Sequence, residues 1–272
     1  MIDVKKALAR SNDIFFYKTA EWLGPNKLAQ YARLFGFGSP TGLQTGQEAS
    51  GLVPDPKWKE MERGENWYLG NTYHFGIGQG DVMVTPIQIA SMTQAIANHG
   101  NLCQSSLLPT LKQNCRDLVI DEKNLDIVLS GMLGACSQGG TAYPLFPYNK
   151  TLEANMAAQN LSDVEKINQG MVACKTGTAE FGGADARGYR RTHAWTTAIV
   201  GIDQAKMIAS TQTAMVDENL PKRTEWLDLV KKNGFPSKLV ITVLVESDLN
   251  QIYSEGSQDA APVIVKLLDW IF

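Results

Sequence analysis

The chain has 272 residues, of which 44% are hydrophobic and 19% are charged, which is typical of a globular protein that buries a sizeable core. A formal net charge of −3, without a Lys/Arg-rich block, argues against nucleic acid or an anionic membrane surface as a partner. The sequence as given shows neither an 18-residue apolar run nor a signal-peptide pattern.

The cysteines and histidines do not follow a metal-binding pattern. There is no Cys-x-x-Cys pair and no His-Glu-x-x-His motif, so we expect no metal site and no cofactor. Cys103 and Cys115 bracket a proline-containing segment and would form a disulfide clip in an oxidising compartment. The alternative, which we favour at this point, is that all four cysteines are buried free thiols.

The N-terminal part predicts helices, over residues 1–10, Ile14–Leu23 and Asn26–Phe35. Small polar residues before the second helix suggest that Ser11 and Asp13 act as helix caps, and Gly24-Pro25 ends that helix. Residues 36–83 are rich in glycine and proline and predict a long connection rather than a packed unit.

The clearest helix start in the chain is Thr85-Pro86-Ile87-Gln88, which supplies an N-cap, a proline at the first helical position and a capping-box glutamine. This helix should run to about Asn98, and another should cover Lys123–Cys136. Residues 149–168 are polar and acidic and predict a solvated insertion. The glycines of Gly76–Gly80 do not fit a nucleotide-binding fingerprint, because no strand-then-helix frame surrounds them.

The C-terminal part predicts strands, over Met171–Glu180, Ala194–Ile202 and Lys238–Glu246, and then an amphipathic helix over Ala260–Phe272. Helices followed by antiparallel strands and a last helix indicate the α+β class. We expect residues 1–272 to form part of one domain, with a mainly helical part over 1–170 and the strands and last helix in 171–272.

One predicted strand carries polar chemistry at its far end. An apolar run leads into Lys175-Thr176-Gly177-Thr178, in which Lys175 and Gly177 share one face and the two threonines the other. An ammonium, hydroxyls and backbone N–H groups at one sheet edge suit a carboxylate or a developing oxyanion. The alternative is an ordinary strand that ends in a turn.

Two motifs carry a family resemblance. Ser11-Asn12-Asp13 and Lys175-Thr176-Gly177 lie in the order found in penicillin-binding proteins and serine β-lactamases. The segments that match besides these are Gly51–Pro56, Gly76–Gly80, Thr85–Gln88, Gly140–Ala142 and Thr192–Trp195. Together they resemble the transpeptidase domain of class B penicillin-binding proteins, and Asp13 resembles the elongation type. The resemblance covers nearly the whole chain.

The resemblance implies the penicillin-binding protein/serine β-lactamase-like fold, an antiparallel sheet flanked by helices, and it implies roles for the first motif. Ser11 would relay protons and Asp13 would orient the stem peptide of the substrate. Lys175 would supply positive charge and hold Ser11.

For the strand motif, the resemblance implies substrate binding. Thr176 and Thr178 would bind the carboxylate of the donor stem, and the backbone N–H of Thr178 would form half of the oxyanion hole. Gly177 would let another group approach the backbone closely. His193 and Trp195 are expected to be structural, and Cys174 to serve packing.

The family's nucleophile comes from a Ser-x-x-Lys motif, but no serine of this sequence has lysine three residues later. We therefore expect an N-terminally truncated piece that lacks the nucleophile helix and the first strands, and that is inactive alone. Extending the reading frame upstream should reveal the motif. The alternatives are a non-catalytic stem-peptide-binding or partner-binding derivative, or a β-lactamase or D,D-carboxypeptidase.

The resemblance also implies a setting. The full-length protein would cross-link stem peptides in bacterial peptidoglycan synthesis, bind β-lactams and shape the cell wall together with elongasome or divisome membrane proteins. It would act on the extracytoplasmic face of the cytoplasmic membrane, with its anchor in the missing N-terminal part.

Relatives usually join the last two strands by a short hairpin, so residues 203–237 would be an insertion, with a helix over Thr224–Lys232. It is either a tolerated surface insertion or a partner-docking arm.

Overall fold

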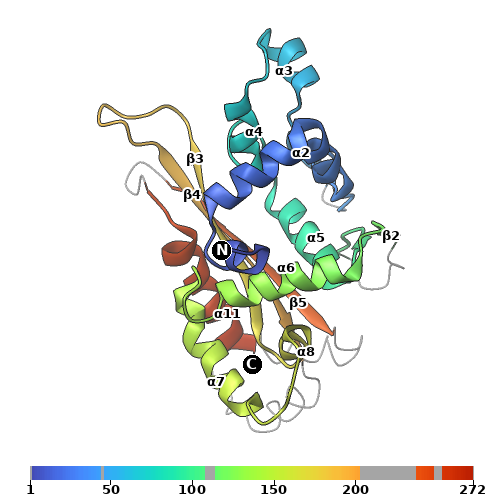
Figure 1. Ribbon diagram of the computed structural model, residues 1–272, viewed down its shortest axis with the longest axis vertical. Coiled ribbons are helices and arrows are strands. Elements are labelled where there is room, and N and C mark those ends of the chain that lie inside the picture. The colour runs from blue at the N-terminus through green and yellow to red at the C-terminus, as the bar shows by residue number, and fades with distance from the viewer. Residues whose placement is uncertain (1, 44–45, 108–113, 203–236, 248–252, 272) are drawn as a thin grey trace.

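A computed structural model describes residues 2–43, 46–107, 114–202, 237–247 and 253–271. Its centre is an antiparallel sheet with the strand order β3-β4-β5, flanked by helices (Figure 1). The sheet strands are β3 (Val172–Phe181), β4 (Arg191–Gly201) and β5 (Lys238–Val245). The predicted α+β class is confirmed, and the three predicted strands lie within three residues of their observed bounds.

The other elements lie around this sheet, except that α3 projects away from it at the top of the view in Figure 1. The helices are α1 (Val4–Ala9), α2 (Asp13–Leu34), α3 (Pro56–Arg63), α4 (Leu69–Gly76), α5 (Pro86–Ala97), α6 (Glu122–Ala135), α7 (Phe146–Met156), α8 (Asp163–Asn168) and α11 (Ala261–Ile271). A small hairpin pairs β1 (Asn101–Cys103) with β2 (Cys115–Asp117). A 3-10 turn (Tyr143–Leu145) precedes α7, and a π-helical turn (Gly256–Ala260) leads into α11.

Alternation along the strands places a separate hydrophobic core on each face of the sheet. Cys174 and Ala198 point to one face and pack with Ile264 of α11. Ala173 and Ile199 point to the other face and pack with side chains of α5, α6 and α8. Successive side chains on a strand face opposite sides, so every second residue of β3 belongs to the same core. The start of β3 and the middle of β4 are therefore packed on both faces.

The helix start at Thr85 forms as predicted. Thr85 Oγ1 accepts the Gln88 N–H at 3.2 Å, and Gln88 Oε1 accepts the Thr85 N–H at 2.9 Å. The buried Gln88 also donates from Nε2 to the carbonyls of Ser39 and Ser50, both at 2.8 Å. One side chain thus caps α5 and holds the preceding segment against it.

The prediction of an unpacked connection over residues 36–83 is wrong, because α3 and α4 lie within it. Asp55 caps α3 by accepting the Trp58 N–H at 2.8 Å, with Pro56 at the first helical position. Helix α4 lies so close to α2 that a Cβ at Gly76 would overlap Ala20. Two of the glycines in this range thus belong to helices: Gly64 ends α3, and Gly76 is the point of close contact between α4 and α2.

Three other predictions have different outcomes. Residues 149–168 form α7 and α8, whose Asn149, Met156 and Ile167 are buried, so a solvated insertion is wrong. The predicted stop at Gly24-Pro25 is confirmed, because Gly24 has non-helical angles (φ 74°, ψ 161°) that divide α2 into two helical segments at a kink. The predicted insertion over 203–237, with its helix, lies outside the described residues apart from Ser237.

In the described part of the chain, no helix has both the length and the apolar character needed to span a bilayer.

Asn149 links helix α7 to the first residue of β3. Its side chain accepts the Val172 N–H at 2.8 Å and donates to the Val172 carbonyl at 2.8 Å and to the Cys136 carbonyl at 3.1 Å.

Replacing Asn149 by Leu leaves these buried backbone groups without partners, so the free energy of unfolding should fall by about 3 kcal/mol in urea denaturation. Lys150→Ala, on the exposed side of the same helix, should change it by less than about 0.5 kcal/mol. An equally small loss for Asn149→Leu would contradict this role.

Candidate functional site

The first motif lies at the sharp junction between α1 and α2. Asn12 is the N-cap of α2, since its Oδ1 accepts the Phe15 N–H at 2.9 Å. The prediction that Ser11 and Asp13 are the caps is therefore wrong. Ser11 has φ 49°, a left-handed conformation that a non-glycine residue adopts at a cost. With Asn12 as the cap, the Ser11 hydroxyl is available for another contact.

The close packing of α1 against α6 holds this junction near the sheet. A Cβ at Gly131 of α6 would lie 2.7 Å from Leu8 Cβ, and one at Gly134 would lie 3.0 Å from Ala9 Cβ. Such distances mean that only glycine lets α1 approach this closely. This contact was not predicted from the sequence, although two glycines three residues apart inside a predicted helix were a signal for it.

Ser11 and Lys175 meet, although 164 positions separate them in the chain. Lys175 Nζ donates a hydrogen bond to Ser11 Oγ at 2.8 Å and another to the Thr176 carbonyl at 2.7 Å. The structure therefore brings the two motifs into direct contact. Asp13 lies close enough to act electrostatically on Lys175.

The environment of Lys175 disfavours its positive charge. Burial lowers the pKa of Lys175 from its ordinary 10.5 to about 8, and the charge of Asp13 opposes this by raising it. At pH 8 about half of the Lys175 side chains are then neutral amines that can accept a proton. A lysine with such a pKa can serve as a base near neutral pH.

The edge of β3 that faces away from β4, which pairs with no other strand in the described part of the chain, presents backbone groups to this site. The Thr176 carbonyl accepts from Lys175, and the Thr178 carbonyl accepts from Gln79 Nε2 at 2.9 Å. In an antiparallel strand the N–H and C=O of one residue point to the same side, so those of Thr176 and Thr178 point away from β4. The Thr178 N–H is thus on the side where the predicted oxyanion-binding role requires it. The role of Gln79 was not predicted from the sequence. The signal for it is that Gln79 is the only polar side chain in the glycine-rich segment Gly76–Gly80.

The strand is supported from behind by close backbone contacts. Gly256 lies against Gly177 and Trp195 so closely that a Cβ there would overlap the Trp195 carbonyl. Thr196 Oγ1 donates to the Gly256 carbonyl at 2.8 Å. At the end of the hairpin, the His193 ring stacks on Phe181 with centroids 3.8 Å apart. It is therefore Gly256 that must stay small, because its turn packs directly on the backbone of Gly177, whereas a Cβ at Gly177 would make only an ordinary contact with Trp195 at 3.4 Å.

All four cysteines form disulfides, Cys103–Cys115 and Cys136–Cys174, so the favoured interpretation of free thiols is wrong. The second bridge joins the C-terminal end of α6 to the residue before Lys175, with the Cα atoms 5.7 Å apart. Just beyond it, the Thr141 and Thr176 hydroxyls are hydrogen bonded at 2.7 Å. Cys174 thus contributes a covalent link to the strand as well as packing.

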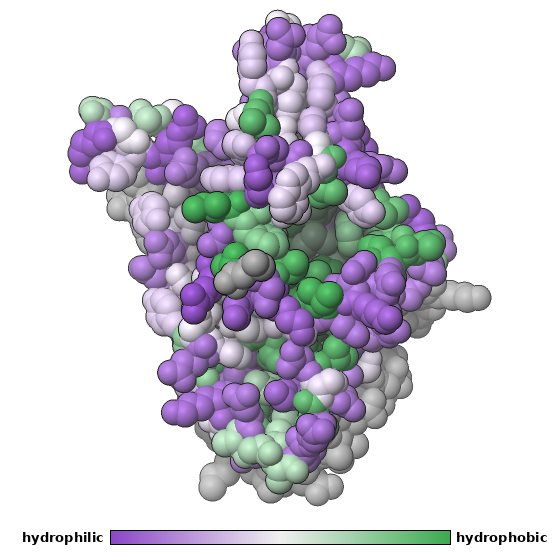
Figure 2. Space-filling model, in the orientation of Figure 1, coloured by the Kyte–Doolittle hydropathy of each residue, from purple (hydrophilic) through white to green (hydrophobic). Residues whose placement is uncertain are grey.

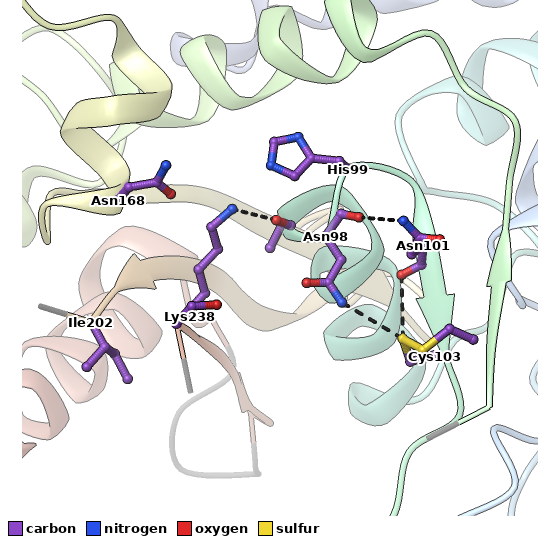
Figure 3. A pocket seen from close by; sticks show the side chains of 10 residues that line it. Asn98, His99, Asn101, Cys103, Asn168, Ile202 and Lys238 are labelled. Carbon is purple, nitrogen blue, oxygen red and sulfur yellow. Dashed lines mark hydrogen bonds between the residues drawn. A yellow bond between two sulfur atoms is a disulfide. The ribbon is translucent and has the colours of Figure 1, made fainter. Parts of the chain in front are cut away.

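The described residues contain no group of three or more His, Cys, Asp or Glu side chains placed to hold a metal ion. A cleft at the other end of the sheet is lined by Asn98, His99, Lys238 and the Cys103–Cys115 bridge (Figure 3). There Lys238 Nζ donates to the Ala97 carbonyl at 2.7 Å, at the C-terminal end of α5 (Figure 3). Its charge is already paired with the helix end, so this cleft is a weaker candidate for chemistry.

A further hollow lies between α2, α5 and α6 and is lined largely by apolar side chains, among them Phe35, Met92, Ile96 and Val128. Hydrophobic surface is visible around the hollows on this face of the molecule (Figure 2). Such a lining suits hydrophobic packing rather than proton transfer. The contact between Ser11 and Lys175 is therefore the best candidate for a catalytic centre.

Comparison with known proteins shows the family of the chain. Residues 1–227 match the family model described as the penicillin binding protein transpeptidase domain. The peptidoglycan D,D-transpeptidase MrdA of Salmonella typhimurium (strain SL1344) is 39% identical over 108 residues, which are 40% of this chain and 17% of that protein.

Two of the similar solved structures illustrate the match. Pseudomonas aeruginosa PBP2 in complex with WCK 5153 has a TM-score of 0.68 at 28% identity, over 99% of this chain and 47% of that chain. The complex between PBP2 and MreC from Helicobacter pylori has a TM-score of 0.58 at 31% identity, over 73% of this chain and 33% of that chain. The present chain thus spans less than half of each of these proteins.

The influence of Asp13 on Lys175 can be measured directly. Asp13→Asn removes a carboxylate that favours the ammonium form, so the pKa of Lys175 should fall further below about 8. A pH titration of the lysine side-chain ¹³Cε resonances reports this value. Asp3→Asn, at the exposed cap of α1, keeps a capping side chain and should leave the pKa of Lys175 unchanged. A rise in the pKa of Lys175 in Asp13→Asn would overturn the assigned electrostatics.

Proposed function

Because the chain belongs to the penicillin-binding protein transpeptidase family, and within it to the class B elongation type, we propose that it is part of a peptidoglycan D,D-transpeptidase that cross-links stem peptides. The observation that carries this proposal is the Lys175–Ser11 hydrogen bond beside the free edge of β3. It joins a hydroxyl, an amine of lowered pKa and outward-facing backbone N–H groups at one place.

The proposed roles follow from this arrangement. Lys175 exchanges a proton with Ser11, which passes it towards the reacting group. Asp13 keeps part of the positive charge on Lys175 and orients the stem peptide. These residues thus handle protons and orientation, while the bond-forming serine of the family belongs to a Ser-x-x-Lys motif.

Substrate binding is assigned to the strand. The hydroxyls of Thr176 and Thr178 would bind the terminal carboxylate of the donor stem, and the Thr178 N–H would donate to the oxyanion that develops. Gln79 holds the Thr178 carbonyl and thereby keeps this part of the strand in place. Gly177 leaves the strand free of a side chain where the substrate lies against it.

We further propose that the chain does not cross-link stem peptides by itself, since none of its serines has lysine three residues later. Removing the nucleophile of another serine hydrolase lowers turnover by roughly 10⁶. The absence of this motif also favours a second candidate function, a stem-peptide-binding derivative of the same fold without chemistry. A β-lactamase or D,D-carboxypeptidase would need the same missing serine.

Partners and location are proposed on separate grounds. A PBP2 of Helicobacter pylori that is similar to this chain was solved in complex with MreC, so we propose elongasome proteins as partners. Two disulfides are typical of proteins outside the reducing cytosol, which supports the extracytoplasmic face of the cytoplasmic membrane as the location.

Peptide binding separates the proposed site from a merely similar fold. In an NMR titration, a stem peptide that ends in D-Ala-D-Ala should shift the amide resonances of Thr176 and Thr178 more strongly than its L-Ala-L-Ala analogue does. Thr178→Val removes one hydrogen bond to a carboxylate and should weaken binding roughly tenfold. Thr151→Val, on the surface of α7, should not change it. Equal binding of both peptides would sink the substrate assignment.

Covalent labelling tests the proposed lack of turnover. A fluorescent penicillin should leave this chain unlabelled after denaturing electrophoresis, whereas a reading frame extended to include Ser-x-x-Lys should be labelled. Stable penicillin labelling of the unextended chain would show that the missing motif is not required.

The disulfides can be counted chemically. When the chain is exported to an oxidising compartment and denatured without reductant, thiol titration should detect essentially no free thiols, and reduction should release all four. Free thiols in the non-reduced protein would argue against the proposed location.

A further inference from the structure

Ser11 has the surroundings of a reactive hydroxyl in its own right. Its side chain is exposed, while the lysine that contacts it is partly buried. Its backbone is held in the left-handed region, with the Ser11 N–H donating to the Leu8 carbonyl at 3.2 Å. Unusual backbone conformations that the surrounding structure imposes are often found at functional sites. Solvent-borne reagents can therefore reach Ser11 Oγ next to its partly buried base.

We propose that Ser11 and Lys175 form a serine–lysine pair in which Ser11 Oγ itself accepts acyl groups from activated esters. This is a different role from proton relay, because a covalent bond forms on Ser11. It does not depend on the proposed transpeptidase function, since it needs only the hydroxyl, the amine and an ester with a good leaving group. Serine–lysine pairs are a known variant of the serine nucleophile.

The chemical step balances within the pair and the ester. The neutral Lys175 amine accepts the Ser11 proton while Ser11 Oγ forms a bond to the ester carbonyl carbon. The tetrahedral oxyanion then lies beside the newly formed ammonium, which stabilises it. When this tetrahedral intermediate collapses, the bond between its carbon and the aryl oxygen breaks. The aryloxide departs, and Ser11 is left as an ester. No oxidant, reductant or metal enters this step.

The groups that face Lys175 decide when this base is available. Ser11 comes from the α1–α2 junction, Asp13 from α2, and the Thr176 carbonyl from β3 itself. Of these, the Asp13 carboxylate is the charged group that favours the ammonium, and burial opposes it more strongly. The neutral amine is therefore the minor form at pH 7 and the major form above about pH 8.

Activated esters are the expected substrate class, in contrast to β-lactams. An aryl ester has a leaving group that departs readily, so a nucleophile with a base suffices. A β-lactam has an amide-type bond, and its acylation needs the complete oxyanion site of the family enzyme. The pair can thus react with esters in a chain that a penicillin does not label.

The probe is 4-nitrophenyl acetate, used with the unmodified 272-residue chain. We expect one acetyl group per chain, located by peptide mass mapping on the peptide that contains Ser11, and release of 4-nitrophenolate at a rate that rises with pH and levels off above about pH 8. Ser162 is the internal comparator, because its exposed hydroxyl contacts the Glu165 carboxylate instead of a lysine. It should stay unacetylated.

Two variants isolate the pair. Ser11→Ala should abolish the Ser11 acetylation. Lys175→Arg keeps a positive charge but cannot accept the proton, so the rate of acetylation should fall roughly 100-fold or more. Ser162→Ala should leave the rate unchanged.

The proposal is overturned by acetylation of Lys175 in place of Ser11, by equal acetylation of Ser11 and Ser162, or by a rate that continues to rise with pH above 9. Mapping and the pH profile use the unmodified chain, so these outcomes remain decisive even if a variant does not fold. A negative result would leave peptide binding at Thr176 and Thr178 untouched, so the two proposals fail separately.

Discussion

The enclosed amine of Lys175 is the constraint on which the rest of the site depends. Its charge is costly away from water, and the structure compensates it with the Ser11 hydroxyl, the Thr176 carbonyl and the nearby Asp13 carboxylate. These partners come from two parts of the chain, the α1–α2 junction and β3, which must both be held in place for the amine to keep its lowered pKa. The lysine is therefore both the chemical centre of the site and the group most sensitive to any movement of its neighbours.

The surrounding architecture supports this contact from two directions. On the helical side, Gly131 and Gly134 of α6 let α1 approach closely enough for Ser11 to reach the strand. On the sheet side, the bridge from Cys136 and the hydrogen bonds of Asn149 tie the start of β3 to α6 and α7. Helix α6 thus contacts both elements that form the site. The middle of α6 packs against α1, and its C-terminal end is linked to β3.

The family could be recognised from sequence because its motifs are short, local and ordered along the chain. The matches at Ser11–Asp13, Lys175–Gly177 and the glycine-rich segments depend on residue type and spacing alone. The match of residues 1–227 to the transpeptidase family confirms that recognition. The roles of the individual site residues remain predictions, because a shared fold places side chains without proving what each one does.

By itself, the sequence determined the α+β class, the three strands, the capped start of α5 at Thr85 and the identity of the two motifs. Periodicity and capping are local properties, and they can be read from neighbouring residues. It did not reveal α3 and α4, the burial of Asn149, the Cys136–Cys174 bridge or the cap at Asn12. Each of these depends on a contact between residues that are distant in the sequence. Gly76 packs against Ala20, Asn149 is hydrogen bonded to Val172, and Ser11 accepts a hydrogen bond from Lys175. Only the tertiary structure could decide them, because the energy of a buried polar group or of a close glycine contact is set by its spatial neighbour.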